Sequence, residues 1–181
     1  MAELTPIQAV QKWLTTVVVD LNFCPFAGKP LADNKVRFVT VESSKKREVL
    51  EIFAHECRKL DSDDSIETTL IILDQGFRSF IDYLDVLDLA GQLLKMEGYE
   101  GVYQVASFHP EYCFEGEAYD DPANFTNRSP YPILHLLREE SVSKAVDSHP
   151  EIDAVPERNI DVARKLGAEH LSQLLEKSHE E

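Results

Sequence analysis

Two histidines lie in a polar segment between His109 and Arg138, and they are the first candidates for chemistry in this sequence. Histidine exchanges a proton near neutral pH, so His109 and His135 are candidate general acid–base groups. His109 directly follows a segment that predicts a strand, and ligands of open α/β sheets gather at the carboxyl ends of strands. The alternative is that each histidine is structural, with its ring nitrogens bonded inside the fold.

Arginines in and after this segment could hold an anion. Arg128 comes just before a segment, from Ser129 or Pro130 to Leu137, that we interpret as a helix, and the free N–H groups at a helix start favour anions. A guanidinium there can bind a carboxylate or phosphate through two hydrogen bonds. Arg138 would share a face of that helix with His135, and Arg158 would lie at the start of the last helix. Salt bridges within the protein are the alternative role. Further ligand-binding candidates, for which turn hydrogen bonds are the alternative, are Asn124, Asn127 and Ser129.

Cys24 is the candidate nucleophile. It precedes Pro25, a residue that suits the first position of a helix, so we predict Cys24 at the cap of a short helix. The positive end of a helix favours the thiolate form of a cysteine. The alternative is an inert thiol packed between Phe23 and Phe26. Cys57 is predicted to lie in the core, and the odd count of three cysteines without a CxxC pair indicates reduced thiols in the cytoplasm.

Metal and cofactor chemistry has weaker support in the sequence. His109, His135 and nearby carboxylates could supply mixed nitrogen and oxygen ligands. However, the sequence has no HExxH motif and no paired CxxC motifs, so we assign no metal ligands. Glycine-rich phosphate loops and a GxSxG elbow are also absent, and the cofactor stays unknown.

The pattern of elements predicts an α/β fold. Thr5, Pro6 and Gln8 form a capping box at the first helix, and Ser79 caps a long central helix. Residues 35–41, 67–74 and 101–108 have the composition of strands. Their alternation with helices predicts a small, mostly parallel sheet of three to four strands packed with about five helices. We expect one globular domain over residues 1–181, with a short frayed C-terminus near 178–181.

The charge of the chain limits its partners. With 18 basic against 33 acidic residues, the net charge of −15 leaves no broad positive surface for nucleic acid or for an anionic membrane. The first residues lack the basic start and apolar run of a signal peptide, so we expect a soluble cytoplasmic protein.

Five segments together resemble an uncharacterised bacterial family of domains of unknown function with about this length. They are residues 22–27 (NFCPFA), 106–110 (ASFHP), 121–132 (DPANFTNRSPYP), 134–139 (LHLLRE) and 156–159 (PERN). The resemblance implies a stand-alone domain of unassigned activity. It brings no reaction and no catalytic residues.

Our leading hypothesis is a small enzyme that acts on an anionic or polar small molecule. His109 and His135 would exchange protons, Arg128 and Arg158 would hold the ligand, and Cys24 would be the nucleophile. The first alternative is a non-catalytic module that binds a ligand or a protein, and the second is a metal-binding protein. The sequence predicts neither the oligomeric state nor whether Cys24 lies near residues 109–138.

Overall fold

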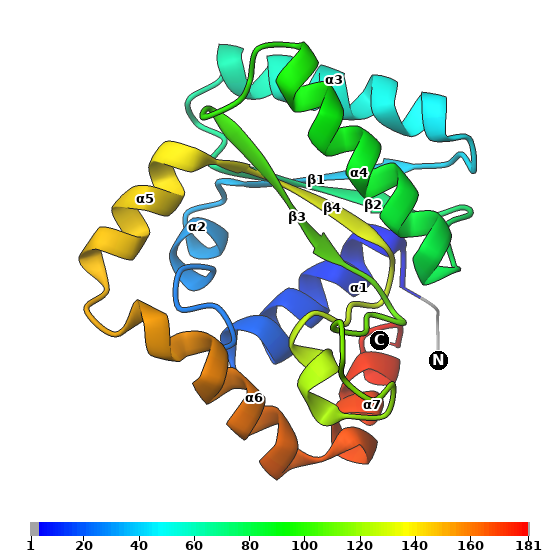
Figure 1. The fold of residues 1–181 in the computed structure, drawn as a ribbon, viewed down its shortest axis with the longest axis vertical. Helices are drawn as coiled ribbons and strands as arrows, with labels where there is room; N and C mark the ends of the chain where they lie inside the picture. The colour runs from blue at the N-terminus through cyan, green and yellow to red at the C-terminus, as the bar shows by residue number, and fades with distance from the viewer. Residues whose placement is uncertain (1–3, 181) are drawn as a thin grey trace.

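A four-stranded mixed sheet lies at the centre of the structure, a computed structural model that describes residues 4–180 (Figure 1). The strand order is β1 (Val36–Val41), β2 (Thr68–Leu73), β4 (Ile133–Arg138), β3 (Tyr103–Phe108). β1 and β2 pair in parallel, whereas β4 runs antiparallel to both of its neighbours, β2 and β3. The α/β class is therefore confirmed. The prediction of a mostly parallel sheet is wrong, because β4 is inserted between two strands of the opposite direction.

β4 occupies the segment that we interpreted as a fourth helix, and that prediction is wrong. Ile133, Leu134 and Leu136 are completely buried, because β4 has a strand on each side and apolar side chains packed on both faces. A short apolar run fits a covered strand and a buried helix equally well, so its periodicity could not separate the two. In a strand, His135 and Arg138 project to opposite faces instead of sharing one.

Helices cover both faces of the sheet (Figure 1). On one face, α3 (Lys46–Ser62) and α4 (Phe80–Met96) enclose a core that includes Phe53 and Tyr83. On the other face, Trp13 and Leu171 belong to a second apolar cluster. The elements that build this second layer are α1 (Pro6–Trp13), a π-helix (Leu14–Val19) and α7 (Ala168–Lys177).

The first helix begins as predicted. The Thr5 hydroxyl accepts the Gln8 N–H at 3.4 Å, and the Gln8 side-chain oxygen accepts the Thr5 N–H at 3.0 Å. These two bonds form the capping box, which satisfies N–H groups that a helix start leaves free. The α-helix ends at Trp13 and continues as the π-helix, after which the chain turns at Asn22 with φ of 55°.

The remaining helices are short and surround the second face. The long terminal helix that we predicted is divided by Gly167, whose φ of 82° is a left-handed conformation that glycine adopts without strain. Residues 4–180 contain seven α-helices against about five predicted, and the ones not yet named are α2 (Gly28–Ala32), α5 (Glu139–Ser148) and α6 (Val155–Leu166). Across residues 4–180, no helix combines the length and the hydropathy needed to cross a lipid bilayer.

The C-terminal residues contact the first helix. Ser178 is 1% exposed, and the Lys12 ammonium donates a hydrogen bond to the Glu180 carbonyl at 2.7 Å. The frayed end that we expect near 178–181 stays a prediction, because Glu180 is exposed and Glu181 lies outside the described residues.

Candidate functional site

His109 connects two loops from the interior of the protein. Its side chain is 0% exposed, its Nδ1 accepts the Glu111 N–H at 2.9 Å, and its Nε2 lies 2.8 Å from the Phe77 carbonyl oxygen. Because Nδ1 accepts, Nε2 carries the proton and donates to that carbonyl. Burial lowers the pKa of His109. Both ring nitrogens are occupied, so the geometry gives His109 a structural role.

The sheet separates His109 from His135. The His109 ring lies 5.2 Å from the ring of Phe80 and 5.0 Å from that of Tyr83, both on α4. α4 covers the face toward which Leu134 and Leu136 project. His135 stands between those two residues on β4 and therefore projects to the opposite face. The two histidines do not form one acid–base pair.

Arg128 is held inside the loop that precedes β4. Its Nε donates to the Tyr112 carbonyl at 3.1 Å and its Nη2 to the Tyr119 carbonyl at 2.7 Å. The guanidinium also lies 4.8 Å from the centre of the Tyr119 ring and 4.6 Å from that of Phe125. The element that follows Arg128 is β4 and not a helix, contrary to our prediction. The Arg128 side chain is 7% exposed and stabilises the loop.

The neighbouring amides and hydroxyl bond to the main chain. Asn124 is 0% exposed within a 3₁₀-helix (Pro122–Thr126), and Ser129 is likewise buried. Asn124 bonds to main-chain groups of Phe114, Ala118 and Tyr119. Asn127 donates to the Ser107 carbonyl, and Ser129 donates to the Tyr131 carbonyl. The loop is thus ordered by the same polar residues that we proposed as ligand contacts.

Arg138 and Arg158 also bond to carbonyl oxygens. Arg138, at the end of β4, donates to the carbonyls of Leu60, Asp63 and Ile66 and so fixes the turn between α3 and β2. The Arg158 Nη2 donates to the Asn22 carbonyl and, at 2.6 Å, to the Asn159 side-chain oxygen. Its Nε is buried without a partner.

Cys24 lies in a turn and not at a helix cap. α2 begins only at Gly28, so the predicted position of Cys24 is wrong. Asn159 of α6 donates to the Phe23 carbonyl at 2.6 Å and, together with Arg158, anchors the residues just before Cys24. The Cys24 side chain is partly exposed and packs against the apolar cluster on the second face of the sheet. Cys24 therefore lies on the same side of the sheet as His135.

His135 belongs to a row of side chains that crosses all four strands. The register places Phe38 beside Leu70, Leu70 beside His135, and His135 beside Ala106. Residues directly opposite one another in a sheet project to the same face. Phe108, two residues after Ala106, joins this face, and its ring centre is 6.0 Å from that of His135.

The tautomer of His135 follows from its hydrogen bonds. The Thr68 hydroxyl lies 2.6 Å from the Leu136 carbonyl oxygen and 2.8 Å from Nε2 of His135. A hydroxyl has one proton, and the carbonyl can only accept it, so His135 Nε2 must donate to the Thr68 oxygen. Nδ1 then carries the lone pair, and no residue from 4 to 180 bonds to it. Burial lowers the pKa of His135 to about 4, so the ring is neutral at pH 7.

The row around His135 remains partly exposed. We use the name His135 face for the partly exposed side chains of Phe38, Ala106, Phe108, His135 and Leu137. By contrast, the neighbouring side chains Leu70, Ile72 and Ile133 on the same side are at most 2% exposed. Phe38 and Phe108 pack against the same apolar cluster as Cys24. The His135 face is therefore the candidate functional site.

Comparison with known families assigns the chain. Residues 5–173 match the family described as Protein of unknown function (DUF1415). The chain belongs to this family. No curated protein and no solved structure matches this DUF1415 member. The family assignment confirms the resemblance seen in the sequence and leaves the activity to be inferred from the geometry.

The described part of this DUF1415 member contains no candidate metal site. Between residues 4 and 180, no group of three or more histidine, cysteine, aspartate or glutamate side chains is arranged to hold a metal ion. The two histidines considered as ligands project to opposite faces of the sheet.

The sequence analysis missed most of the His135 face. Phe38, Ala106 and Leu137 resemble ordinary strand residues, and only pairing of the strands brings them beside His135. Thr68 did carry a signal, because Thr68 and Thr69 are the two polar residues of a strand that is buried along its length. A buried hydroxyl needs a partner, and here its partners are His135 and the main chain of β4.

Proposed function

We propose that this protein binds a small polar molecule on the His135 face, and that the ligand donates an N–H or O–H hydrogen bond to Nδ1 of His135. The observation that carries the proposal is the free lone pair on Nδ1, fixed in place by the bond between Nε2 and Thr68. A ligand N–H or O–H that bonds to this acceptor contributes about 1 kcal/mol net, because it replaces a hydrogen bond with water.

The surroundings of His135 are mostly apolar. Its side chain is partly exposed, Leu70 lies beside it on β2, and the Phe108 ring centre is 6.0 Å from that of His135. Burial lowers the pKa of His135 to about 4. Small-molecule sites of proteins are concave and mostly apolar, with few polar groups that orient the ligand.

The apolar neighbours suggest the body of the ligand. Phe38, Phe108 and Leu137 present rings and an aliphatic side chain around one imidazole, which suits a ligand with an apolar or aromatic part. Arg128 and Arg138 donate to carbonyl oxygens of the protein and stand away from this face. We therefore propose a neutral polar ligand in preference to an anion.

Phenol and anisole test this proposal as a matched pair of probes. Both carry an aromatic ring, but only phenol has the O–H group that can donate to Nδ1. We expect phenol to bind about fivefold to tenfold more tightly, since one hydrogen bond contributes about 1 kcal/mol. Titrations followed by the ¹⁵N resonances of the His135 ring measure both affinities. In His135→Phe the preference for phenol should vanish; a preference that persists, or no shift of the His135 resonances, refutes the site.

A second candidate function is catalysis by Cys24 with His135 as base. The observation that favours it is the partly exposed thiol on the same side of the sheet as the free Nδ1. The sulfur would add to a carbonyl carbon of the ligand while Nδ1 accepts the thiol proton; the C=O π electrons move to the oxygen, which then takes that proton from Nδ1. An imidazole with a pKa of about 4 is a weak base, and this places catalysis second to binding.

Alkylation of Cys24 distinguishes the two candidates. We would measure the rate of reaction with iodoacetamide at pH 7 in a protein whose other cysteines, Cys57 and Cys113, are replaced by serine or alanine. Catalysis requires a rate above that of a free cysteine, and a fall of about tenfold or more in His135→Phe. A rate that is independent of His135 removes catalysis and leaves binding.

The cellular location and the partners of the protein are proposed from the sequence. The acidic composition and the cysteine usage favour the cytoplasm, without nucleic acid or membrane as partners, and a bacterial source is what the family resemblance implies. The chain is proposed to act as one domain.

A further inference from the structure

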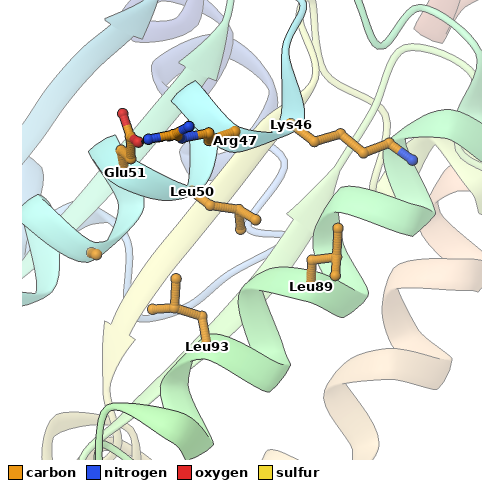
Figure 2. A pocket seen from close by; sticks show the side chains of 7 residues that line it. Lys46, Arg47, Leu50, Glu51, Leu89 and Leu93 are labelled. Carbon is orange, nitrogen blue, oxygen red and sulfur yellow. Dashed lines mark hydrogen bonds and ion pairs between the residues drawn. The ribbon is translucent and has the colours of Figure 1, made fainter.

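The outer side of α3 and α4, away from the sheet, carries an apolar groove of about 410 Å³. Leu50 and Ala54 of α3, with Leu89 and Leu93 of α4, form its floor. Figure 2 shows the three leucines directed into the space between the two helices. Leu50 and Leu93 pack on the core beneath with one side and face outward with the other. The groove is the outermost apolar layer of this half of the protein.

Two exposed apolar side chains, Ile81 and Met96, extend this surface along α4, whereas Leu84 projects away from the groove. Ile81 is 74% exposed, Leu84 is 40% exposed and Met96 is 85% exposed. Of the six large apolar side chains that are exposed within residues 4–180, these three lie on α4. Ile81 and Met96 are 15 residues apart, which is about 22 Å along a helix. Large exposed apolar patches on a protein surface mark sites of association.

The exposed charges of the two helices differ in their balance. On the outer side of α3 the cations Lys46, Arg47 and Arg58 are interspersed with the carboxylates Glu48 and Glu51. On α4 the exposed charges of the first half are all carboxylates, namely Asp82, Asp85 and Asp88. The Lys46 ammonium lies 3.0 Å from the Asp85 carboxylate, which places the first turn of α3 level with the first half of α4.

We propose that this surface is the interface of a symmetric homodimer, in which α3 of one protomer packs across α4 of its partner. A twofold axis along the groove produces this arrangement, because it exchanges the two helices while keeping their direction. Cations of one α3 then lie beside carboxylates of the other α4, and the apolar floors are buried together with Ile81 and Met96. A twofold axis across the helices would instead put α3 on α3 and bring like charges together.

The net charge of the chain favours the arrangement in which α3 packs across α4 of the partner. Two chains of −15 each repel one another over most of their surface. A contact between them must therefore place some opposite charges in register, and in this arrangement the cations at the first turn of α3 meet the carboxylates in the first half of α4. Arg47, whose side chain is 88% exposed and pairs with Glu51 on its own helix, can extend that pair to Asp88 of the partner.

Sedimentation equilibrium of the full chain at 5–200 µM tests the proposal. We expect a mass of twice 20.6 kDa at the upper concentrations. Ile81→Glu and Met96→Glu place charges in the interface at positions too exposed to affect folding, and each should raise the dissociation constant at least about 100-fold. Val146→Glu, a change of the same kind on α5, should leave it unchanged. A monomer at every concentration, or a dimer insensitive to both α4 variants, overturns the proposal.

A charge exchange tests the arrangement of the helices. Arg47→Glu and Asp88→Arg should each weaken association about tenfold, since each puts like charges together across the interface. The double variant R47E/D88R restores opposite charges and should recover most of the affinity. If the losses of affinity of the two single variants simply add in the double variant, α3 does not lie across α4 of the partner, and the arrangement is refuted.

Discussion

Thr68 of β2 determines which nitrogen of His135 on β4 is protonated. The hydroxyl donates to the Leu136 carbonyl and accepts from His135 Nε2, at 2.6 and 2.8 Å. The imidazole that projects from the second face of the sheet is therefore a hydrogen-bond acceptor at Nδ1. The proposed ligand site depends on this bond between two neighbouring strands.

Replacing Thr68 with valine keeps the shape of the side chain and removes the hydroxyl. We expect the His135 ring to change from one Nε2–H tautomer to a mixture, which long-range ¹H–¹⁵N spectra detect directly. The free energy of unfolding should fall by about 1 kcal/mol, because the Leu136 carbonyl loses a donor. Thr15→Val, at an exposed hydroxyl that bonds to Gln11, is the matched control and should leave the His135 spectrum unchanged. A wild-type ring protonated at Nδ1 would contradict the assignment.

The stability of the protein should fall on acidification because of His135. Its pKa is lowered to about 4 in the folded state from the ordinary histidine value of 6.5, so the unfolded chain binds the proton more tightly between these values. Stability is complete above about pH 7.5 and is lost as the pH falls through 6.5 toward 4, by about 2 kcal/mol at pH 5. His109, whose pKa is also lowered, adds a loss of the same sign. Urea denaturation at several pH values should show a flatter profile in His135→Phe; identical profiles would contradict the burial of His135.

Much of the fold was predictable because several signals are local. The capping box at Thr5 and the Ser79 cap of α4 depend on residues three positions apart, and both are present. The first three strands have β-branched and apolar runs with clear limits, and all three form. β4 has prolines before it and an apolar run that fits two structures, and only its pairing with β2 and β3 decides between them.

The candidate site was less predictable because the partners of its residues are distant in sequence. Arg128 bonds to carbonyls 9 and 16 residues away, and Arg138 bonds to carbonyls more than 70 residues away. A carbonyl belongs to every residue, so the sequence cannot show which one an arginine will meet. His135 was identified for its titration, whereas the property that distinguishes it is the free nitrogen left by Thr68.

Replacing His109 with alanine should destabilise the protein strongly. The change leaves the Phe77 carbonyl and the Glu111 N–H without their partner and opens a cavity at a fully buried position. Together these effects cost about 3 kcal/mol in the free energy of unfolding, measured by urea denaturation. His170→Ala, at an exposed position on α7, should change it by less than about 0.5 kcal/mol. If the two variants were equally stable, the structural role of His109 would be wrong.

Arg128→Lys separates the charge of this residue from its geometry. Lysine keeps the positive charge but lacks the planar guanidinium that bonds to the Tyr112 and Tyr119 carbonyls at once and contacts the rings of Tyr119 and Phe125. We expect a loss of about 2 kcal/mol in the free energy of unfolding. Arg47→Lys at an exposed position is the control and should be nearly neutral. Phenol affinity at the His135 face should stay within about twofold in folded Arg128→Lys protein; a large loss would make Arg128 a ligand contact.

The three cysteines should differ in their accessibility to alkylation. Cys57 is 0% exposed, and burial raises its pKa to about 12, so it lacks both access and thiolate character. Cys24 and Cys113 are partly exposed. At pH 8 and room temperature, iodoacetamide should modify Cys57 at least about 1,000-fold more slowly than Cys24, because reaction at Cys57 requires opening of the core beneath α3. Peptide mass spectrometry over time measures the three rates, and the difference should disappear in 8 M urea. Equal rates in the folded protein would show that the packing of α3 on the sheet does not protect Cys57.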